Sequence, residues 1–146
     1  MIKSVGKVAT LAAVAVLASL ASAHAEGNAE AGADVFRKCM ACHRVGEGAK
    51  NLVGPVLNGV LGRKAGTAAE FNYSDLNKAA GAAGLEWNEA RVFEYLEEPN
   101  TFLKKFLTAA GKPELAEGQT KMTFKLADKQ DREDVIAYVK KYSPGK

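Results

Sequence analysis

The sequence predicts an all-α fold with about five helices. Apolar residues recur at helical spacing in several segments, most clearly near the C-terminus, at Val135, Ile136, Val139 and Tyr142. No segment of useful length alternates apolar and polar residues, as a half-buried β-strand would. Residues that start or stop helices separate the helical segments from one another. These observations together favour a helical domain without a sheet.

Each expected helix is bounded by residues that start or stop it. The side chains of Asn28 and Asp128 can accept hydrogen bonds from the backbone N–H groups of a first turn, so both are expected to be N-caps. Ser74 or Asp75 is expected to start the second helix, and Pro99 is expected to stop the third. The expected helices are residues 28–40, 74–81, 88–97, 100–110 and 128–143.

The N-terminal residues 1–25 have the pattern of a cleaved secretory signal peptide. Lys3 and Lys7 form a basic head, residues 8–20 form an uncharged apolar run, and Ala23-His24-Ala25 supplies the small residues of a cleavage site. The alternative is a retained membrane anchor, but the apolar run is short for a spanning helix. The mature chain is therefore expected to be exported, most simply to a bacterial periplasm.

After cleavage, residues 26–146 are enough for a single domain. The formal net charge of +3 falls to +1, because Lys3 and Lys7 are removed and no acidic residue leaves with them. The mature sequence has no long basic run, so the charge pattern does not favour nucleic-acid binding.

The sequence Cys-Met-Ala-Cys-His at residues 39–43 is the strongest chemical motif. A structural zinc site needs four Cys or His ligands, but His24 is lost with the signal peptide and only Cys39, Cys42 and His43 remain. A thioredoxin-like pair lacks its βαβ context, and a disulfide would close too small a loop to add much stability. We therefore expect covalent attachment of one haem through both cysteines, with His43 as an iron ligand. The glycine-rich segment 44–73 is expected to be mostly loop wrapping one haem face.

Met122 is the candidate for the second axial position of the iron. The mature chain has no second histidine, Met1 is removed, and Met40 lies within the attachment motif. Met122 lies among polar residues before the last helix, where a loop can pass over a haem, although Met also fills gaps in apolar cores. If Met122 were only structural, the sixth position would be open and the protein would be an enzyme or a gas-binding haem protein.

Ordered blocks along the rest of the chain carry a family resemblance. They are Gly32–Phe36, Cys39–His43, Val53–Gly59, Leu61–Lys64, Phe71–Ser74, Gly84–Trp87, Glu94–Pro99, Thr120–Phe124 and Arg132–Tyr138. With these blocks the chain resembles the class I c-type cytochromes, and among them the long cytochrome c2 type. The resemblance implies a class I cytochrome c fold in which the first and last helices cross near Gly32 and pack Phe36 against residues 136–138.

The resemblance also implies roles for residues around the haem. The Pro55 carbonyl would accept the ring N–H of His43, and Tyr95 would hydrogen-bond the Met122 sulfur. The remaining implied positions surround the haem propionates, a nearby polar network and the exposed haem edge, and they are Arg63, Tyr73, Trp87, Asn77 and Phe124. The chain departs from the shorter mitochondrial pattern in three places: one residue fewer between Phe36 and Cys39, extra residues at about 81–84, and a longer insertion at about 102–118. The sequence does not indicate the role of this insertion.

With both axial positions filled, the protein is expected to be a mobile one-electron carrier and not an enzyme. The resemblance implies a quinol-oxidising cytochrome bc1-type complex as donor, and a photosynthetic reaction centre or terminal oxidase as acceptor. A monomer with transient interfaces and only transient membrane-surface association is expected; a fixed electron-entry subunit of a larger enzyme is the alternative. A positive ring for docking to acidic partners is expected from Lys38, Lys50, Lys104, Lys105, Lys121 and Lys125.

Overall fold

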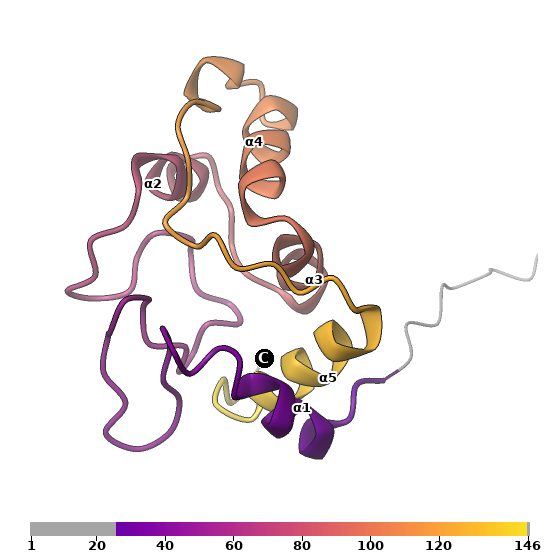
Figure 1. The fold of residues 1–146 in the computed structure, drawn as a ribbon. Coiled ribbons are helices and arrows are strands. Elements are labelled where there is room, and N and C mark those ends of the chain that lie inside the picture. The colour runs from indigo at the N-terminus through magenta and orange to yellow at the C-terminus, as the bar shows by residue number, and fades with distance from the viewer. Residues whose placement is uncertain (1–25, 146) are drawn as a thin grey trace, which may run out of the picture.

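Five α-helices and one short 3-10 helix are connected by long loops in residues 26–145, the part of the chain that this computed structural model describes (Figure 1). They are α1 (Ala29–Phe36), α2 (Asp75–Ala82), α3 (Glu89–Glu97), α4 (Pro99–Ala109), η1 (Pro113–Leu115) and α5 (Lys129–Lys140). No strand occurs in this range beyond an isolated bridge between Lys64 and Glu86. The predicted all-α class is confirmed. The expected signal peptide, residues 1–25, lies outside the described residues.

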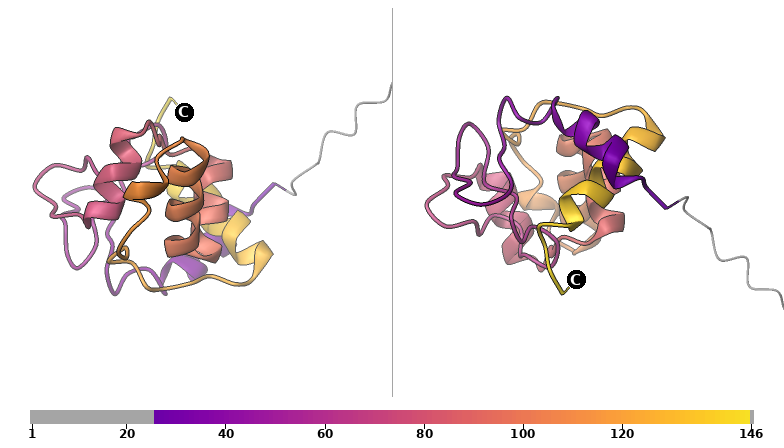
Figure 2. Two further views of the ribbon diagram at one scale, coloured as in Figure 1. Left: turned by 90° about the horizontal axis from the view of Figure 1, so that it is seen from above. Right: turned by 90° about the horizontal axis from the view of Figure 1, so that it is seen from below.

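Helices α1 and α5 cross at Gly32, as expected, and lie side by side in Figures 1 and 2. A Cβ atom on Gly32 would lie only 2.0 Å from the backbone oxygen of Asp134, so the two backbones touch where Gly has no side chain. The Asp134 carboxylate accepts the backbone N–H of Asn28 at 2.7 Å, and Phe36 packs on Tyr138 with ring centroids 5.2 Å apart. The N-terminal and C-terminal helices therefore form one unit.

Two of the expected helix ends were wrong by three or four residues, and the other helix boundaries agree with the expectation to within one residue. Helix α1 ends at Phe36 and not near Met40, because the N–H groups of the next three residues bond to carbonyls three positions back, as in a tighter 3-10 turn. Helix α5 ends at Lys140 and not near Pro144 for the same reason. Helix α2 is capped by Ser74, whose hydroxyl accepts the N–H of Asn77 at 3.2 Å.

Pro99 both stops α3 and opens α4. A proline at the first helical position needs no hydrogen-bond partner for its nitrogen, so α4 begins one residue earlier than expected. Between the two helices Glu98 has an extended backbone, with φ −153° and ψ 82°. The chain therefore turns a corner at residues 96–100. The insertion after it continues α4 and adds η1, which the sequence did not predict.

Loop residues form the other side of the molecule, and segment 44–73 contains no helix, as expected. Helix α2 packs tightly on this loop, since a Cβ atom on Gly81 would lie 1.9 Å from the Ala65 backbone oxygen. In the described part of the chain, no helix has the length and apolar character needed to cross a bilayer.

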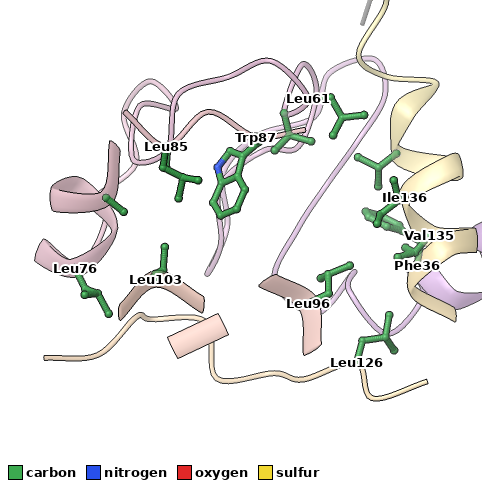
Figure 3. Packing of buried hydrophobic residues seen from close by; sticks show 14 of the residues in the cluster. Phe36, Leu61, Leu76, Leu85, Trp87, Leu96, Leu103, Leu126, Val135 and Ile136 are labelled. Carbon is green, nitrogen blue, oxygen red and sulfur yellow. The ribbon is translucent and has the colours of Figure 1, made fainter. Parts of the chain in front are cut away.

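The apolar core is arranged around a central space and does not fill it. Figure 3 shows side chains from helices and loops facing this space, including Leu61, Trp87, Leu96 and Ile136, all of which are buried. Leu85, Leu103 and Leu107 form a second part of the core under α2 and α4 and are fully buried. The helices thus hold one another while leaving a cavity toward the loops.

Candidate functional site

A cavity of about 350 Å³ opens in the centre of the molecule and contains the chemistry that the sequence singled out. Cys39, Cys42, His43 and Met122 all line it. The first three come from the turn after α1, and Met122 comes from the loop before α5. Residues 79 or more positions apart in the sequence are therefore brought to one space by the folding of the chain.

The turn after α1 directs the attachment motif into the cavity. The backbone N–H of His43 bonds to the Cys39 carbonyl at 2.9 Å, and that of Cys42 bonds to the same carbonyl at 3.0 Å. Positions three and four apart lie on one side of a helical turn, so both cysteines and the histidine face the same way. The two thiols are not joined to each other.

His43 is held in one orientation by its neighbours. Its Nδ1–H donates to the Pro55 carbonyl at 2.7 Å, because a carbonyl can only accept. Burial lowers the pKa of His43, with the Pro55 hydrogen bond opposing this and Arg63 adding to it, so the ring is neutral near pH 7. Nε2 then keeps its lone pair for a metal. Gly54 packs against the ring, since a Cβ atom there would lie 2.5 Å from Cε1.

Arg63 and Tyr73 supply hydrogen-bond donors to the same cavity. Arg63 donates to the Val56 carbonyl at 3.0 Å and hydrogen-bonds with Tyr73, while its Nε is buried without a partner. Burial lowers the pKa of Arg63, although Tyr73 opposes the shift, and a guanidinium stays charged near neutral pH. An orphaned cationic N–H at a cavity wall fits a buried anionic group such as a haem propionate.

On the Met122 side, polar residues meet beneath the loop. Asn77 is buried and donates to the Thr120 hydroxyl at 3.5 Å, and the same hydroxyl accepts the backbone N–H of Met122 at 3.4 Å. Tyr95 hydrogen-bonds with both Thr120 and Asn77, and burial, the larger effect, raises the Tyr95 pKa. The expected bond from Tyr95 to the Met122 sulfur stays a prediction.

Aromatic residues complete the cavity wall. Trp87 is buried and packs on Tyr95 with ring centroids 4.8 Å apart, and Phe102 of α4 stacks behind Trp87 at 6.0 Å. Phe124 lies at the mouth of the cavity and is 40% exposed, as a residue at a cofactor edge should be. The expected positions around the haem are therefore brought together on one cavity.

The residues of the site fit a haem better than they fit a zinc ion or a thioredoxin-like redox pair. Within residues 26–145 no cluster of three or more His, Cys, Asp or Glu side chains is placed to hold a metal ion, which disfavours zinc. Burial raises the pKa of the Cys39 thiol to about 11, opposed by Lys38, whereas a reactive redox pair needs a lowered thiol pKa. Two thiols, a neutral imidazole, a thioether and a cationic wall are the groups that a covalently bound haem requires.

The six expected docking lysines are distributed unequally around the cavity. Lys38 and Lys121 line it, but Lys38 is paired with Asp131 at 2.8 Å and Lys121 bonds to the Asn72 carbonyl. Lys125 is paired with Glu98, and Lys50 is exposed in the 44–73 loop. Lys104 and Lys105 lie apart from these, at a separate hollow on α4.

Four residues with clear roles in the site's geometry were missed by the sequence reasoning. Gly54, Thr120 and Arg132 lie within blocks that carry the family resemblance, and those blocks are the signal that could have identified them. Asn100 accepts the backbone N–H of Thr120 at 3.1 Å, and the buried Arg132 donates to the Leu126 carbonyl at 2.9 Å. The bond between Asn100 and Thr120 spans 20 positions and has no local sequence signature.

Comparison with known proteins identifies the family of the chain. The sequence profile of the family Cytochrome c matches residues 29–143. Cytochrome c2 iso-2 of Rhodospirillum centenum is 59% identical over 119 residues, which are 82% of this chain and 98% of the relative. Cytochrome c2 of Rhodopseudomonas palustris is 52% identical over 139 residues, 95% of this chain and 97% of the relative.

Solved structures show the same fold. The structure of cytochrome c2 from Rhodospirillum centenum superimposes with a TM-score of 0.80 and 59% identity, covering 81% of this chain and all of that one. Ferricytochrome c2 from Rhodopseudomonas palustris gives a TM-score of 0.75 at 56% identity, covering 79% of this chain and 98% of that one. The chain belongs to the cytochrome c family, as a class I electron-transfer protein of the cytochrome c2 type whose cofactor is haem c.

Proposed function

We propose that this cytochrome is a mobile one-electron carrier of the bacterial periplasm in which His43 and Met122 are the two axial ligands of the haem iron. The observation that carries the proposal is that an imidazole with a free Nε2 and a thioether line the same cavity. When bound, haem c supplies an iron that changes between the ferrous and ferric states. With protein ligands in both axial positions, no substrate needs to bind at the iron.

Visible absorption spectra of the oxidised and reduced protein test the axial ligands. We expect a low-spin c-type spectrum with the far-red sulfur-to-ferric-iron band in the wild type. Met122→Ala should remove this band and allow the ferrous protein to bind carbon monoxide. A wild-type protein that is already high-spin and binds carbon monoxide would overturn the proposal in favour of ligand-binding or peroxidase chemistry.

Residues of the cavity wall would bind the haem covalently and compensate the charge of its propionates. Cys39 and Cys42 would form thioethers with the vinyl groups, and Arg63 with Tyr73 would donate hydrogen bonds to the propionates. Trp87 would close the wall beside them, where burial excludes water. Arg63→Lys keeps the charge but removes the fork of donors, so it should lower the reduction potential less than Arg63→Leu, as measured by redox titration.

Export is the second part of the proposal. We infer that cleavage before Glu26 releases the mature chain to the periplasm, on the basis of the basic head, apolar run and Ala-His-Ala sequence at residues 1–25. Mass spectrometry of the protein from a periplasmic extract should give the mass of residues 26–146 with one haem. A protein that stays with the membrane fraction at its full length would refute this.

The partners are proposed from the family and from the surface charge. We infer a cytochrome bc1-type donor and a reaction centre or terminal oxidase as acceptor, each met transiently by a monomer through the lysines near the cavity mouth. Stopped-flow oxidation and reduction with the purified complexes test this, and the rates should fall as salt rises. Constant co-purification with one catalytic subunit would instead indicate a fixed electron-entry subunit.

A further inference from the structure

The loop that carries Met122 has no helix or strand of its own from residue 118 to residue 128, here called the Met122 loop. Such a segment must satisfy its backbone groups through other parts of the chain or through water. The hydrogen-bond partners of this loop come mainly from two neighbouring segments. One is the corner between α3 and α4, residues 96–100, and the other is the first turn of α5.

At the start of the loop, Asn100 is the anchor. Its side-chain Oδ1 accepts the backbone N–H of Thr120 at 3.1 Å. Thr120 is 5% exposed, and its hydroxyl in turn accepts the backbone N–H of Met122 at 3.4 Å and a side-chain N–H of Asn77 at 3.5 Å. A direct chain of hydrogen bonds therefore runs from Asn100 through Thr120 to the backbone of Met122.

At the end of the loop, Leu126 is fixed from two sides. Its N–H donates to the Leu96 carbonyl at 2.8 Å, and its carbonyl accepts from Arg132 at 2.9 Å. Arg132 also donates to the Ala127 carbonyl at 2.9 Å. The Arg132 side chain is buried, at 4% exposure. Its guanidinium lies 4.4 Å from the centre of the Phe93 ring, so α3 and α5 hold it between them.

The anchored ends separate the loop from the insertion that precedes it. Since Asn100 and Thr120 are in direct contact, the chain leaves the corner at residue 100 and returns to the same point at residue 120. Most of α4 and all of η1 lie in this excursion. The bond between Asn100 and Thr120 therefore closes this excursion at its base, next to Met122.

We propose that Asn100 is a positioning residue for the axial methionine, and that the corner at 96–100 holds the Met122 loop in place. This inference depends on the proposed ligation of iron by Met122. Release of Met122 requires the loop to lift, which breaks the Asn100 bond. Removing that acceptor therefore raises the population of the open loop. One net hydrogen bond corresponds to about a threefold to tenfold change in such an equilibrium.

Three variants of the haem-loaded protein test the inference. Asn100→Ala removes the acceptor, and Asn100→Asp retains an oxygen that can accept the Thr120 N–H. Asn58→Ala is the matched control, because Asn58 makes two hydrogen bonds with the Gly46 backbone, both at 2.8 Å, in the loop on the His43 side. The measurements are binding of imidazole to the ferric protein, which reports opening of the sixth position, and guanidinium unfolding, which reports global stability.

We expect imidazole binding about threefold to tenfold stronger in Asn100→Ala, near-wild-type binding in Asn100→Asp, and no change in Asn58→Ala even where its global stability falls. Hydrogen exchange of the Met122 and Leu126 amides should accelerate in Asn100→Ala alone. Equal effects of Asn100→Ala and Asn58→Ala, or no effect of either, would overturn the role of Asn100. A wild-type protein without the far-red sulfur band would instead refute ligation by Met122, and the exchange measurement would still decide whether the corner holds the loop.

Discussion

Substitution of Gly54 by alanine tests how the histidine ligand is held. A Cβ atom at Gly54 would lie 2.5, 2.8 and 2.9 Å from Cε1, Nδ1 and Nε2 of His43. Carbon atoms in contact prefer separations of about 3.5–4.0 Å, so the ring or the loop must move by about 1 Å. The ring cannot turn freely, because Nδ1 is bonded to the Pro55 carbonyl at 2.7 Å.

Whether Gly54→Ala stabilises or destabilises the protein depends on three contributions to the free energy of unfolding. Gly54 is not among the glycines with positive φ, so alanine suits its backbone, and reduced freedom of the unfolded chain would add about 0.4–1 kcal/mol of stability. Overpacking costs about 1–3 kcal/mol. Loss of the hydrogen bond to Pro55 costs about 0.5–1.5 kcal/mol more. The contact with the ring therefore prevails, and we expect a net loss of about 0.5–4 kcal/mol.

Guanidinium unfolding followed by Soret absorption measures the loss, and redox titration detects the displaced imidazole. Gly48→Ala is the control in the same loop, because Gly48 has φ of +70° and no atom lies within 4 Å of its Cβ position. That variant carries only backbone strain of about 1–2 kcal/mol and should keep the wild-type potential. If Gly54→Ala were as stable as the wild type and had its potential, packing of Gly54 would not orient His43.

Three further predictions concern the rest of the molecule. Gly32→Ala should destabilise the protein by about 3 kcal/mol or more, since its Cβ would lie 2.0 Å from the Asp134 backbone oxygen, and a variant that unfolds at the wild-type guanidinium concentration would contradict this. Arg132→Gln leaves two loop carbonyls without their donor and should cost about 2–4 kcal/mol by the same unfolding assay, with Arg37→Gln, an exposed arginine of the α1 end, as the neutral control. Asp131→Asn releases Lys38 from its ion pair and should speed association with an acidic redox partner at low salt by about twofold. Asp34→Asn makes the same charge change at the Arg37 pair and should have less effect. Equal acceleration by the two variants would mean that net charge alone matters.

Most of the fold could be predicted because its signals are local. Asn28, Ser74, Asn88 and Asp128 each cap a helix through a side chain that accepts a nearby backbone N–H. The helix ends were less accurate, because the last turns of α1 and α5 tighten into 3-10 geometry, a choice made by packing and not by composition. Helix η1 was missed since three residues after a glycine carry too little periodicity to recognise.

The haem attachment motif could be predicted for a different reason: its chemistry needs three residues at fixed spacing in one short segment. Some of the bonds that hold the ligands and the fold in place gave no such signal. Asn100 bonds to Thr120 across 20 positions, and Asn28 bonds to Asp134 across 106. Asn100 in the sequence is simply a polar residue after Pro99, and only the fold shows what its side chain accepts.

The two expected iron ligands come from loops, which are usually the more mobile parts of a protein. Here each loop is tied down by bonds to its neighbours: Pro55 and Gly54 restrain His43, and Asn100 and Arg132 restrain the loop of Met122. An enzyme whose iron binds a substrate needs one axial side to open, whereas a carrier works best when both ligands stay in place in both oxidation states. The restraints on the Met122 side therefore matter for function more than their hydrogen-bond strength suggests. Weakening them should convert the carrier toward a ligand-binding protein without any change at the haem contacts themselves.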